Sequence, residues 1–351
     1  MLCIINLCSI SGCLEDVMTD EAKIKRFHEQ VQKIQSEIAV EMVGQDKIVR
    51  QLLIAVICGG NVLLEGVPGL GKTRLVRTLG KVLDLDFSRI QFTPDLMPAD
   101  VTGTNIVVKD KSGQNVFSFQ EGPVFSNIVL ADEINRATPK TQSALLEAMQ
   151  EHTVSAGGET HKLPQPFFVL ATQNPMEQEG TYPLPEAQLD RFFFKLWVDF
   201  PSLDELRQIV DMTTGLEERH AQKAADGSTI FELREVAKAV PIAAAVEDYA
   251  LRLVLSTHAE SECAAEVSKK YLRYGASPRA AQAVISAAKC QALFEGRYNV
   301  SFEDVRYAAY PVLRHRIICN FEALSSGETA ETIIAKLIDE LKAKPYNKQN
   351  R

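Results

Sequence analysis

One short stretch of the sequence has the residue types and spacing needed to hold phosphate groups. Residues 66–73 read GVPGLGKT, which satisfies the pattern GxxxxGKT, and they directly follow the apolar run VLLE at 62–65. Glycines let the backbone approach a phosphate closely, and successive amides at a helix N-terminus attract an anion. We expect Lys72 to reach the β- and γ-phosphates and the Thr73 hydroxyl to ligate Mg²⁺. A glycine-rich turn with no ligand is the weaker interpretation, because a strand precedes the motif and a helical pattern follows it.

Two acidic residues end a second apolar run, IVLADE at 128–133. Open α/β sheets place their ligands at the carboxyl ends of the strands, which is where Asp132 and Glu133 fall. Asp132 is the natural partner for Mg²⁺, and Glu133 is the natural base to orient or deprotonate an attacking water. A strand that ends in a solvated acidic turn is the alternative, and the phosphate motif upstream makes it less favoured.

A third apolar run, FFVLA at 167–171, ends in Thr172, Gln173 and Asn174. A neutral amide beside a terminal phosphate can hold a water in line without changing the charge of the site, and we assign that role to Asn174. Asn before Pro is also a common way to open a turn, so this assignment depends on the position of Asn174 in the series of strands.

The elements that must position these residues alternate between strands and helices. Short strands are predicted at 62–65, 126–133 and 167–174, and the segments between them have helical periods or many turn residues. This alternation predicts an α/β layer fold. After 200–210 the alternation stops, and the periods at 246–265, 278–294 and 302–313 are helical, which predicts a second, all-helical domain. The predicted organisation is a disordered leader at 1–20, an αβα nucleotide-binding domain at 21–202, a linker at 203–240, a helical lid at 241–345 and a loose tail at 346–351.

The composition is typical of a globular protein with room for two domains: 351 residues, 46% hydrophobic and 24% charged. The 38 basic and 46 acidic residues give a net charge of −8, which disfavours sequence-independent nucleic-acid binding. We find no apolar stretch of the roughly 18 residues that a membrane span needs. The seven cysteines form no CxxC pair, so we expect reduced thiols and a cytoplasmic location rather than a zinc site or a disulfide framework.

The set of motifs resembles the AAA+ ATPases and, within them, the MoxR family. The resemblance covers about 41–313 and is carried by VGQ at 43, GVPGLGKT at 66, RIQFTPDLMPADVTGT at 89, EGPVFSNIVLADEINRA at 121, TQNPMEQEGTYPLPEAQLDRF at 172 and GASPRA at 275. It implies a Walker A motif at 66–73, a Walker B motif ending in Asp132 and Glu133, and Asn174 as sensor 1. It also implies that Val43 and Gly44 line the adenine pocket. The full set of residues implied to contact ATP is Val43, Gly44, Gly66, Val67, Pro68, Gly69, Leu70, Gly71, Lys72 and Thr73.

Two arginines extend this resemblance beyond the phosphate loop. Arg191 in LDRF occupies the place of an arginine finger, and Arg279 in SPRA occupies that of sensor 2. An arginine finger stabilises charge on the phosphoryl oxygens in the transition state, so Arg191 is expected to act on the nucleotide of a neighbouring subunit. Arg279 is expected to touch the γ-phosphate of its own subunit. Arg136 is a second candidate for the intersubunit role. The non-catalytic alternative for Arg191 or Arg279 is an ion pair on the surface, for example with Asp190.

Two inserted hairpins are also predicted, one within 95–125 with its turn at 111–113 and one within 150–164 with its turn at Gly157 and Gly158. The resemblance places them as the inserts of a wider clade with MCM helicases and magnesium chelatase, where they are candidates to grip a client. It implies an ATP- and Mg²⁺-dependent chaperone-like ATPase that forms a ring, with a hexamer expected, and acts on protein partners such as von Willebrand factor A domain proteins. The alternatives are a nucleotide-gated scaffold without significant turnover and an MCM-like DNA motor, which the acidic charge disfavours.

Overall fold

The computed structural model describes residues 20–67, 69–109, 111, 113–174, 180–214 and 219–343 of the 351-residue chain. The predicted leader therefore lies outside the described residues apart from Asp20, which begins the first helix. Pro68 of the phosphate motif and the predicted tail from residue 346 also lie outside them.

A parallel sheet of five strands forms the centre of the described chain, in the order β2-β5-β8-β1-β9. The strands are β1 (Val62–Glu65), β2 (Phe87–Gln91), β5 (Ile128–Asp132), β8 (Phe168–Gln173) and β9 (Phe194–Trp197). Val62 at the start of β1 lies opposite Leu170 of β8 and Phe194 of β9. The predicted α/β fold class is confirmed, and β2 and β9 are strands that the sequence pattern did not indicate.

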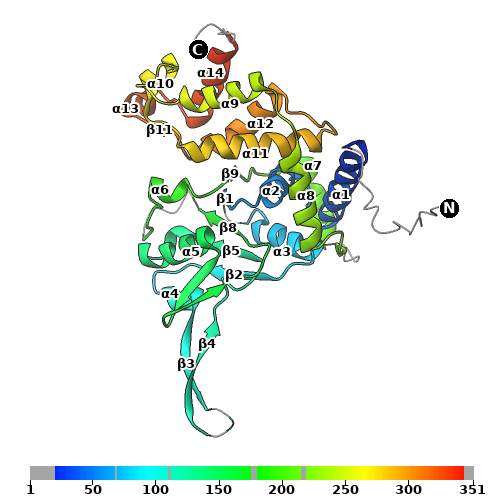
Figure 1. Cartoon of the computed structure of the whole chain (residues 1–351), viewed down its shortest axis with the longest axis vertical. Helices are drawn as coiled ribbons and strands as arrows, with labels where there is room; N and C mark the ends of the chain where they lie inside the picture. The colour runs from blue at the N-terminus through cyan, green and yellow to red at the C-terminus, as the bar shows by residue number, and fades with distance from the viewer. Residues whose placement is uncertain are drawn as a thin grey trace, which may run out of the picture.

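Alternate residues of the strands face two separate cores, which makes the domain an αβα sandwich. Val62 and Leu64 of β1 join the first core, whereas Leu63 between them joins the second. Successive side chains of a strand point to opposite faces, so a fully apolar strand must be covered on both sides. The first face is covered by α1 (Asp20–Glu41), α2 (Asp46–Cys58) and α3 (Lys72–Val82), and the second by α5 (Pro139–Glu151), with the short helices α4 (Pro98–Thr102), η1 (Ile134–Arg136) and α6 (Glu186–Leu189) near the sheet (Figure 1).

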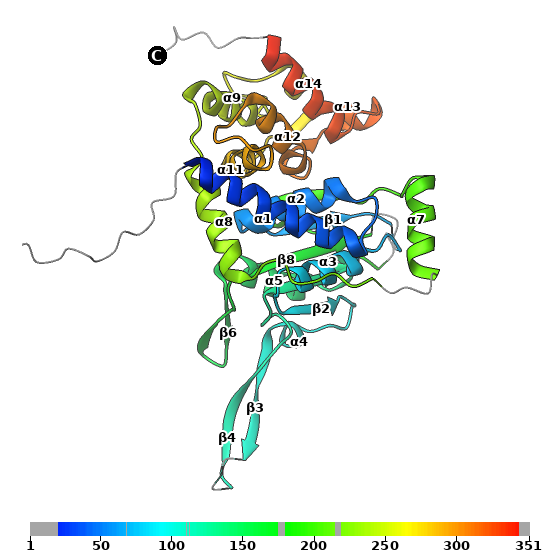
Figure 2. The same cartoon turned by 90° about the vertical axis from the view of Figure 1, so that its right-hand side faces the viewer.

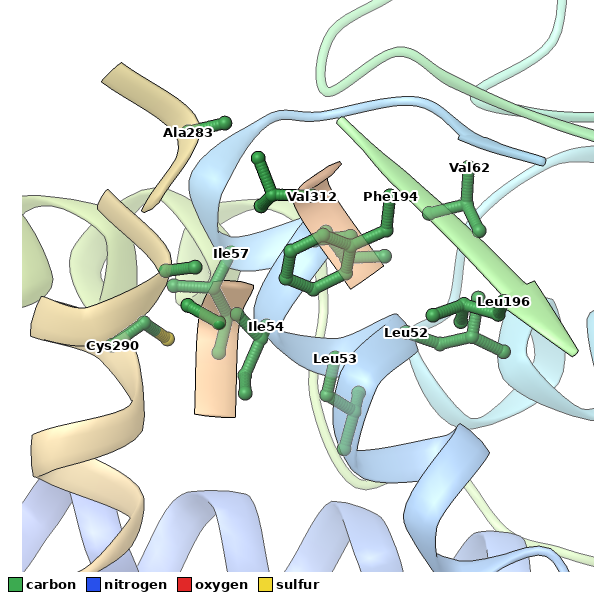
Figure 3. Packing of buried hydrophobic residues seen from close by; sticks show 14 of the residues in the cluster. Leu52, Leu53, Ile54, Ile57, Val62, Phe194, Leu196, Ala283, Cys290 and Val312 are labelled. Atoms are coloured by element: carbon green, nitrogen blue, oxygen red, sulfur yellow. The ribbon is translucent and has the colours of Figure 1, made fainter. Parts of the chain in front are cut away.

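A helical lid packs along the β9 edge of the sheet (Figures 1 and 2). Its elements are α9 (Ala244–Leu255), α10 (Glu266–Tyr271), β10 (Leu272–Tyr274), α11 (Pro278–Phe294), α12 (Phe302–Leu313), β11 (Ile318–Cys319), α13 (Phe321–Ser325) and α14 (Ala330–Ala343). Figure 3 shows Ile54 and Ile57 of α2 packed between Phe194 of β9 and Val312 and Cys290 of the lid. The lid therefore shares one continuous core with the sheet domain. None of the described helices combines the length and apolar character that a bilayer span requires.

The segment predicted as a linker, 203–240, contains two helices, α7 (Leu203–Thr214) and α8 (Gly227–Ala239). Ile230 and Leu233 of α8 are buried, and α8 packs against α1, α2 and α11. The chain before α8 is also fixed, because the Ala221 amide donates to the Glu41 carboxylate at 3.0 Å. Burial disfavours the charged form of Glu41, but hydrogen bonds from Thr78, Ala221 and Lys81 outweigh it and lower the pKa of Glu41. The apolar face of α8 is too narrow to stand out in the sequence.

Both predicted hairpins are present, and they project together below the sheet (Figures 1 and 2). The longer one pairs β3 (Gly103–Lys109) with β4 (Asn115–Glu121), and the shorter one pairs β6 (Thr153–Ala156) with β7 (Glu159–Lys162). The rings of Phe119 in β4 and His161 in β7 stack with centroids 3.9 Å apart, which joins the two hairpins near their bases. Val107 and Phe117, opposite each other farther along the long hairpin, are 58% and 79% exposed.

Candidate functional site

The phosphate motif forms the turn from β1 into α3. Gly69 and Gly71 have φ values of +87° and +75°, and Gly71 is the N-cap of α3, which begins at Lys72. A Cβ added at Gly69 would meet nothing within 4 Å, so this part of the loop opens to solvent, whereas one at Gly66 would lie 2.9 Å from the Val198 carbonyl oxygen. An open loop of amides at a helix N-terminus fits a bound phosphate.

Lys72 lies within this loop and faces several acids. Its Nζ donates to the Gly66 carbonyl oxygen at 2.6 Å. Burial lowers the pKa of Lys72, while the charges of Asp132, Glu133 and Glu65 act in the opposite direction. The ammonium group therefore sits between the loop backbone and the acids at the end of β5, where it can bind a phosphate. Thr73, the next residue, is half-buried in the first turn of α3.

Asp132 ends β5 within a network of hydrogen bonds. Its Oδ1 accepts from Thr172 Oγ1 at 2.6 Å, and its Oδ2 accepts from Arg89 Nη2 at 2.6 Å and from Arg89 Nε at 3.0 Å. These charge-assisted hydrogen bonds fix the position of the carboxylate. The Thr73 hydroxyl and the Asp132 carboxylate are hard oxygen ligands of the kind that Mg²⁺ takes together with substrate phosphates, so the donor set fits that ion.

Glu133 adopts a backbone conformation that few non-glycine residues adopt, with φ 55° and ψ 50°. Its amide donates to Thr172 Oγ1 at 2.9 Å, and its Oε2 accepts from Gln91 Nε2 at 2.9 Å and from Arg136 Nη1 at 3.0 Å. The carboxylate is thus held beyond the end of the sheet by groups from β2 and η1. Arg136, the rival intersubunit arginine, pairs with the Glu133 of its own chain.

Asn174 directly follows β8, at the same edge of the sheet. The residue is buried, with 7% of its surface exposed. Two residues earlier, Thr172 lies opposite Leu64 of β1, so Asn174 emerges beside the start of the phosphate loop. The three predicted strand ends are therefore brought together at the carboxyl edge of the sheet, as the sequence predicted.

The residues proposed to line the adenine pocket lie against helix α7. Gly44 has φ +74°, and a Cβ placed there would lie 2.5 Å from Glu205 Cδ. The neighbouring Gln45 donates from Nε2 to the Leu70 carbonyl oxygen at 3.0 Å, which ties this segment to the phosphate loop. Val43 is half-buried beside them. The VGQ segment therefore lies next to the phosphate loop, with α7 above it.

Arg191 and Arg279 lie at the opposite, amino edge of the sheet. Arg191 belongs to the turn that precedes β9. Arg279 contacts the same turn, because its Nη1 lies 3.5 Å from Oδ2 of Asp190. The four-residue strand β9 separates this turn from the edge with the phosphate loop, about 13 Å at the usual rise per residue. The expected contact of Arg279 with the nucleotide of its own chain is therefore not supported. Arg279 instead forms the ion pair with Asp190 that was considered as its non-catalytic alternative. Arg191 Nη1 donates to the Leu146 carbonyl oxygen at 3.0 Å.

Three residues that hold the acids in place were not singled out from the sequence. Arg89 and Gln91 come from β2, which was missed because only Ile90 of this strand is buried. Thr172 bridges Asp132 and Glu133, yet its position at the end of β8 gave it no distinct role. The alternation of polar and apolar residues in SRIQF, 88–92, is the signal that points to β2.

Comparison with known proteins agrees with this geometry. Residues 61–194 match the ATPase family associated with various cellular activities (AAA), and residues 264–337 match the AAA lid domain. Chaperone MoxR1 of Mycobacterium tuberculosis is 44% identical over 302 residues, which are 86% of this chain and 79% of that protein. YeaC of Bacillus subtilis is 43% identical over 306 residues, which are 86% and 91% of the two chains.

A more distant sequence and a solved structure extend the same similarity. Protein MoxR of Paracoccus denitrificans is 30% identical over 335 residues, which are 91% of this chain and 96% of that protein. The crystal structure of a Cytophaga hutchinsonii protein assigned as an ATPase superposes with a TM-score of 0.84 at 42% identity, covering 91% of this chain and 96% of that one. With both domains and most of the length of these relatives matched, the chain belongs to the MoxR family of AAA+ ATPases.

Proposed function

We propose that this chain is a Mg²⁺-dependent ATPase that hydrolyses ATP at the subunit interfaces of a ring and uses the reaction to remodel protein partners. The observation that carries the proposal is the separation of the phosphate loop and Glu133, at the carboxyl edge of the sheet, from Arg191 and Arg279 at the amino edge. A single subunit cannot bring these groups to one phosphate. A neighbour that presents its amino edge to the phosphate loop supplies the missing arginines.

The residues of the carboxyl edge divide the chemistry among them. Bound Mg²⁺ supplies positive charge to the phosphate oxygens, and Thr73 and Asp132 would hold it. Lys72 binds the phosphates as a point charge. Glu133 orients the attacking water and takes its proton, and Asn174 holds the same water in line with the bond that breaks. The fixed positions of Asp132 and Glu133 support this assignment, because preorganised groups need no rearrangement at the moment of reaction.

The surface beside the phosphate loop supports assembly into a ring. Within the described chain no residue of α7 is buried, and Leu203, Leu206 and Val210 form an exposed apolar stripe, with Phe200 just before the helix. An amphipathic helix without a cover is unusual in a monomer and favours contact with a second copy. An interface between the amino edge of one copy and the carboxyl edge of the next is head-to-tail, and such contacts form a ring when the rotation between copies closes. We propose a hexamer.

Assembly can be tested through the concentration dependence of turnover. If the active site is shared between subunits, ATP turnover per subunit rises with protein concentration in step with the assembled fraction measured by mass photometry. Turnover per subunit that stays constant while the protein dissociates to monomers would contradict the shared site. The substitution of Leu206 by Asp on the α7 stripe is expected to shift this dependence to higher protein concentration.

The long hairpin is the proposed contact for a protein client. Val107 and Phe117 present apolar surface far from the sheet, and the Phe119–His161 stack connects this hairpin to the one between α5 and β8. Because α5 follows the Glu133 segment and β8 leads to Asn174, changes around the nucleotide have a short structural path to the hairpins. A Glu133→Gln chain that traps ATP should retain clients, and the added changes Val107→Ser and Phe117→Ser should weaken that retention.

The client class is proposed from the family resemblance as von Willebrand factor A domain proteins. The experiment is a pull-down from the source cells with the ATP-bound Glu133→Gln form, followed by identification of the retained proteins by mass spectrometry. A von Willebrand factor A domain protein that binds the intact hairpin and not the Val107→Ser, Phe117→Ser form supports this class. Its absence from the retained proteins, or binding that ignores the hairpin changes, counts against it.

Two other functions remain as outcomes of these experiments. A nucleotide-gated scaffold would bind ATP and partners with negligible turnover in the assembled state, although such a scaffold has no need for a fixed Glu133. An MCM-like DNA motor would show turnover stimulated by DNA, and the net charge of −8 disfavours it. Turnover measured with and without DNA separates the three possibilities.

A further inference from the structure

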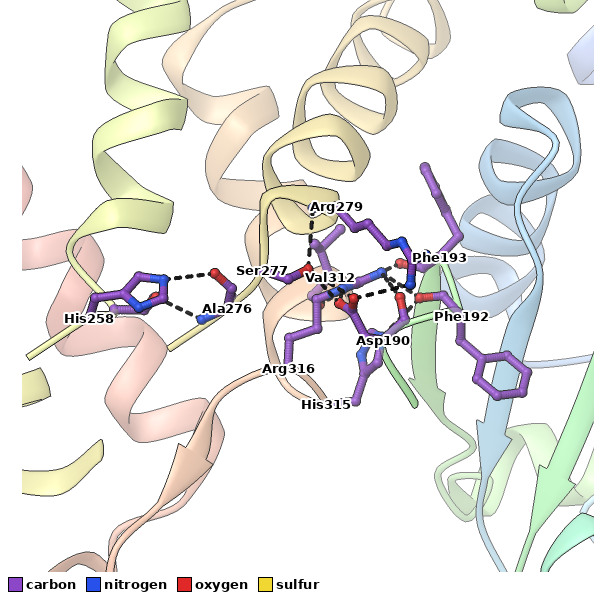
Figure 4. A network of polar contacts seen from close by, with 11 residues as sticks. Asp190, Phe192, Phe193, His258, Ala276, Ser277, Arg279, Val312, His315 and Arg316 are labelled. Carbon is purple, nitrogen blue, oxygen red and sulfur yellow. Dashed lines mark hydrogen bonds and ion pairs between the residues drawn. The ribbon is translucent and has the colours of Figure 1, made fainter. Parts of the chain in front are cut away.

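Arg316, a buried arginine of the lid, lies against Asp190, Phe192 and Phe193 in the turn before β9 (Figure 4). The side chain of Arg316 is only 3% exposed. Its Nη2 donates to the carbonyl oxygens of Asp190 at 3.2 Å and Phe192 at 2.6 Å, which lie on either side of Arg191. Its Nη1 donates to the carbonyl oxygens of Phe193 at 3.2 Å and Val312 at 2.6 Å. The lid therefore fixes the backbone on both sides of the proposed finger.

The same guanidinium also holds the carboxylate to which Arg279 is bound. Arg316 Nε donates to Asp190 Oδ1 at 3.0 Å, while the Ser277 hydroxyl lies 2.8 and 2.9 Å from the two oxygens of that carboxylate. Ser277 is the N-cap of α11, and Arg279 lies in the first turn of this helix. Asp190 is thus shared by Arg316, Ser277 and Arg279. Both proposed intersubunit arginines are held by contacts that lead to Arg316.

The chemistry of this contact depends on the shape of the arginine side chain. All five N–H groups of a guanidinium have planar, fixed directions, and here five acceptors surround them. Burial lowers the pKa of Arg316 to about 10, and Asp190 opposes the shift, so the group stays charged at neutral pH. A lysine has three donors on a flexible stem and cannot meet the same five acceptors.

We propose that Arg316 is a positioning residue for Arg191 and Arg279, so that the seating of the lid decides whether a subunit can complete the site of its neighbour. This inference rests on the proposed intersubunit reaction. It gives a role to Arg316, which lies within the matched lid domain but in none of the sequence motifs quoted above. Arg316 itself lies at the amino edge, where its hydrogen bonds go to Asp190, Phe192, Phe193 and Val312. A subunit that lacks the Arg316 contacts should still bind ATP normally but should fail as a donor of arginines.

The test begins with Arg316→Lys, which keeps a positive charge beside Asp190. The expected result is a fall in kcat on the order of 10²-fold, as for misplacement by about an ångström, with KM and ATP affinity unchanged. The matched control is Arg297→Lys, which weakens a bidentate pair with the buried Asp304 inside the lid. It disturbs lid stability without touching the Asp190 turn, so its kcat should stay close to that of the wild type.

Mixed rings then decide where Arg316 acts. A ring of Arg316→Lys and Lys72→Ala subunits should recover about a quarter of the wild-type turnover. In a random mixture, the intact phosphate loop of an Arg316→Lys subunit meets the intact arginines of a Lys72→Ala subunit at about one interface in four. A ring of Arg316→Lys and Arg191→Ala subunits should recover nothing, since neither subunit can donate. Recovery in the second mixture, or failure of the first in rings verified by native mass spectrometry, would overturn the inference.

A separate control keeps this result distinct from the proposed function. Arg191→Ala mixed with Lys72→Ala must recover turnover if catalysis is shared between subunits at all. If that mixture stays inactive, the intersubunit reaction itself is wrong. If it recovers while Arg316→Lys mixed with Lys72→Ala does not, only the positioning role of Arg316 fails.

Discussion

The two edges of the central sheet are built in different ways. The carboxyl edge collects short contiguous motifs, and each functional group there lies at the end of a strand or in the loop after it. The amino edge joins Asp190, Ser277, Arg279 and Arg316, which are separated by up to 126 residues in the sequence. The half of the site that binds nucleotide is therefore determined by local sequence, whereas the half that completes a neighbour depends on how the lid packs.

The largest expected effect comes from the amino edge. Arg191→Ala should reduce ATP turnover by roughly 10³- to 10⁵-fold, the usual contribution of an arginine finger. Because Arg191 is distant from the phosphate loop of its own chain, the affinity for ATP should not change. Turnover and equilibrium binding of a fluorescent ATP analogue measure the two quantities. A large loss of ATP affinity would show that Arg191 acts within its own subunit.

The matching change at the carboxyl edge is Glu133→Gln. We expect turnover to fall by roughly 10²- to 10⁴-fold, because the amide cannot take a proton from the attacking water. Binding of Mg²⁺–ATP should persist, since Lys72, Thr73 and Asp132 are unchanged. Glu235→Gln on the exposed surface of α8 serves as a control for the loss of a carboxylate. A Glu133→Gln enzyme with normal turnover contradicts the assigned base.

A smaller effect separates the amino edge from the interior of the lid. Ser277 and Ser301 both cap helices and both donate to a carboxylate, Asp190 in the first case and Asp304 in the second. Replacement of either by Ala should lower the free energy of unfolding by about 1–2 kcal/mol through the lost cap. Only Ser277→Ala should also lower kcat, because only that serine holds the Asp190 carboxylate. Equal kcat values in the two variants would contradict the comparison.

The smallest predicted effect is a pH dependence at the amino edge. His315 donates from Nε2 to the Phe192 carbonyl oxygen at 3.0 Å. Burial, followed by the charge of Arg316, lowers the pKa of His315 well below its usual value of 6.5. The unfolded chain therefore binds a proton below pH 6.5 that the folded chain does not, so stability falls as the pH drops from 6.5. The loss is at most about 1.4 kcal/mol per pH unit.

The substitution His315→Gln tests this dependence, since an amide can still donate to the Phe192 carbonyl. Urea unfolding at pH 7.5 and 5.5 should show a smaller loss of stability for the variant than for the wild type. The same loss in both proteins would mean that His315 does not contribute to the acid sensitivity.

The sequence predicted the carboxyl edge better than the amino edge for a physical reason. Lys72, Asp132, Glu133 and Asn174 each follow an apolar strand closely, and parallel strands bring their carboxyl ends together. The contacts of Arg279 depend instead on the orientation of the lid, which no local pattern encodes. The expectation that it reaches its own nucleotide was for this reason not supported.

Packing also explains which elements were missed. β2 and α8 each bury a narrow set of side chains, so their periods are weak in the sequence although the tertiary structure fixes them. Arg316 follows Arg314 and His315 in the sequence, and its burial against five acceptors distinguishes it in the structure. Side chains of this kind are identified from the structure, because their partners come from distant parts of the chain.

The most direct test of the central claim is the mixture of Arg191→Ala with Lys72→Ala. Each homogeneous ring should be inactive, because one lacks donors and the other lacks phosphate binding. Shared catalysis predicts that the verified mixed ring regains about a quarter of the wild-type turnover. This activity comes from the interfaces at which an intact phosphate loop meets an intact Arg191. Mixed rings that remain as inactive as their parents would contradict the claim that neighbouring subunits build the site together.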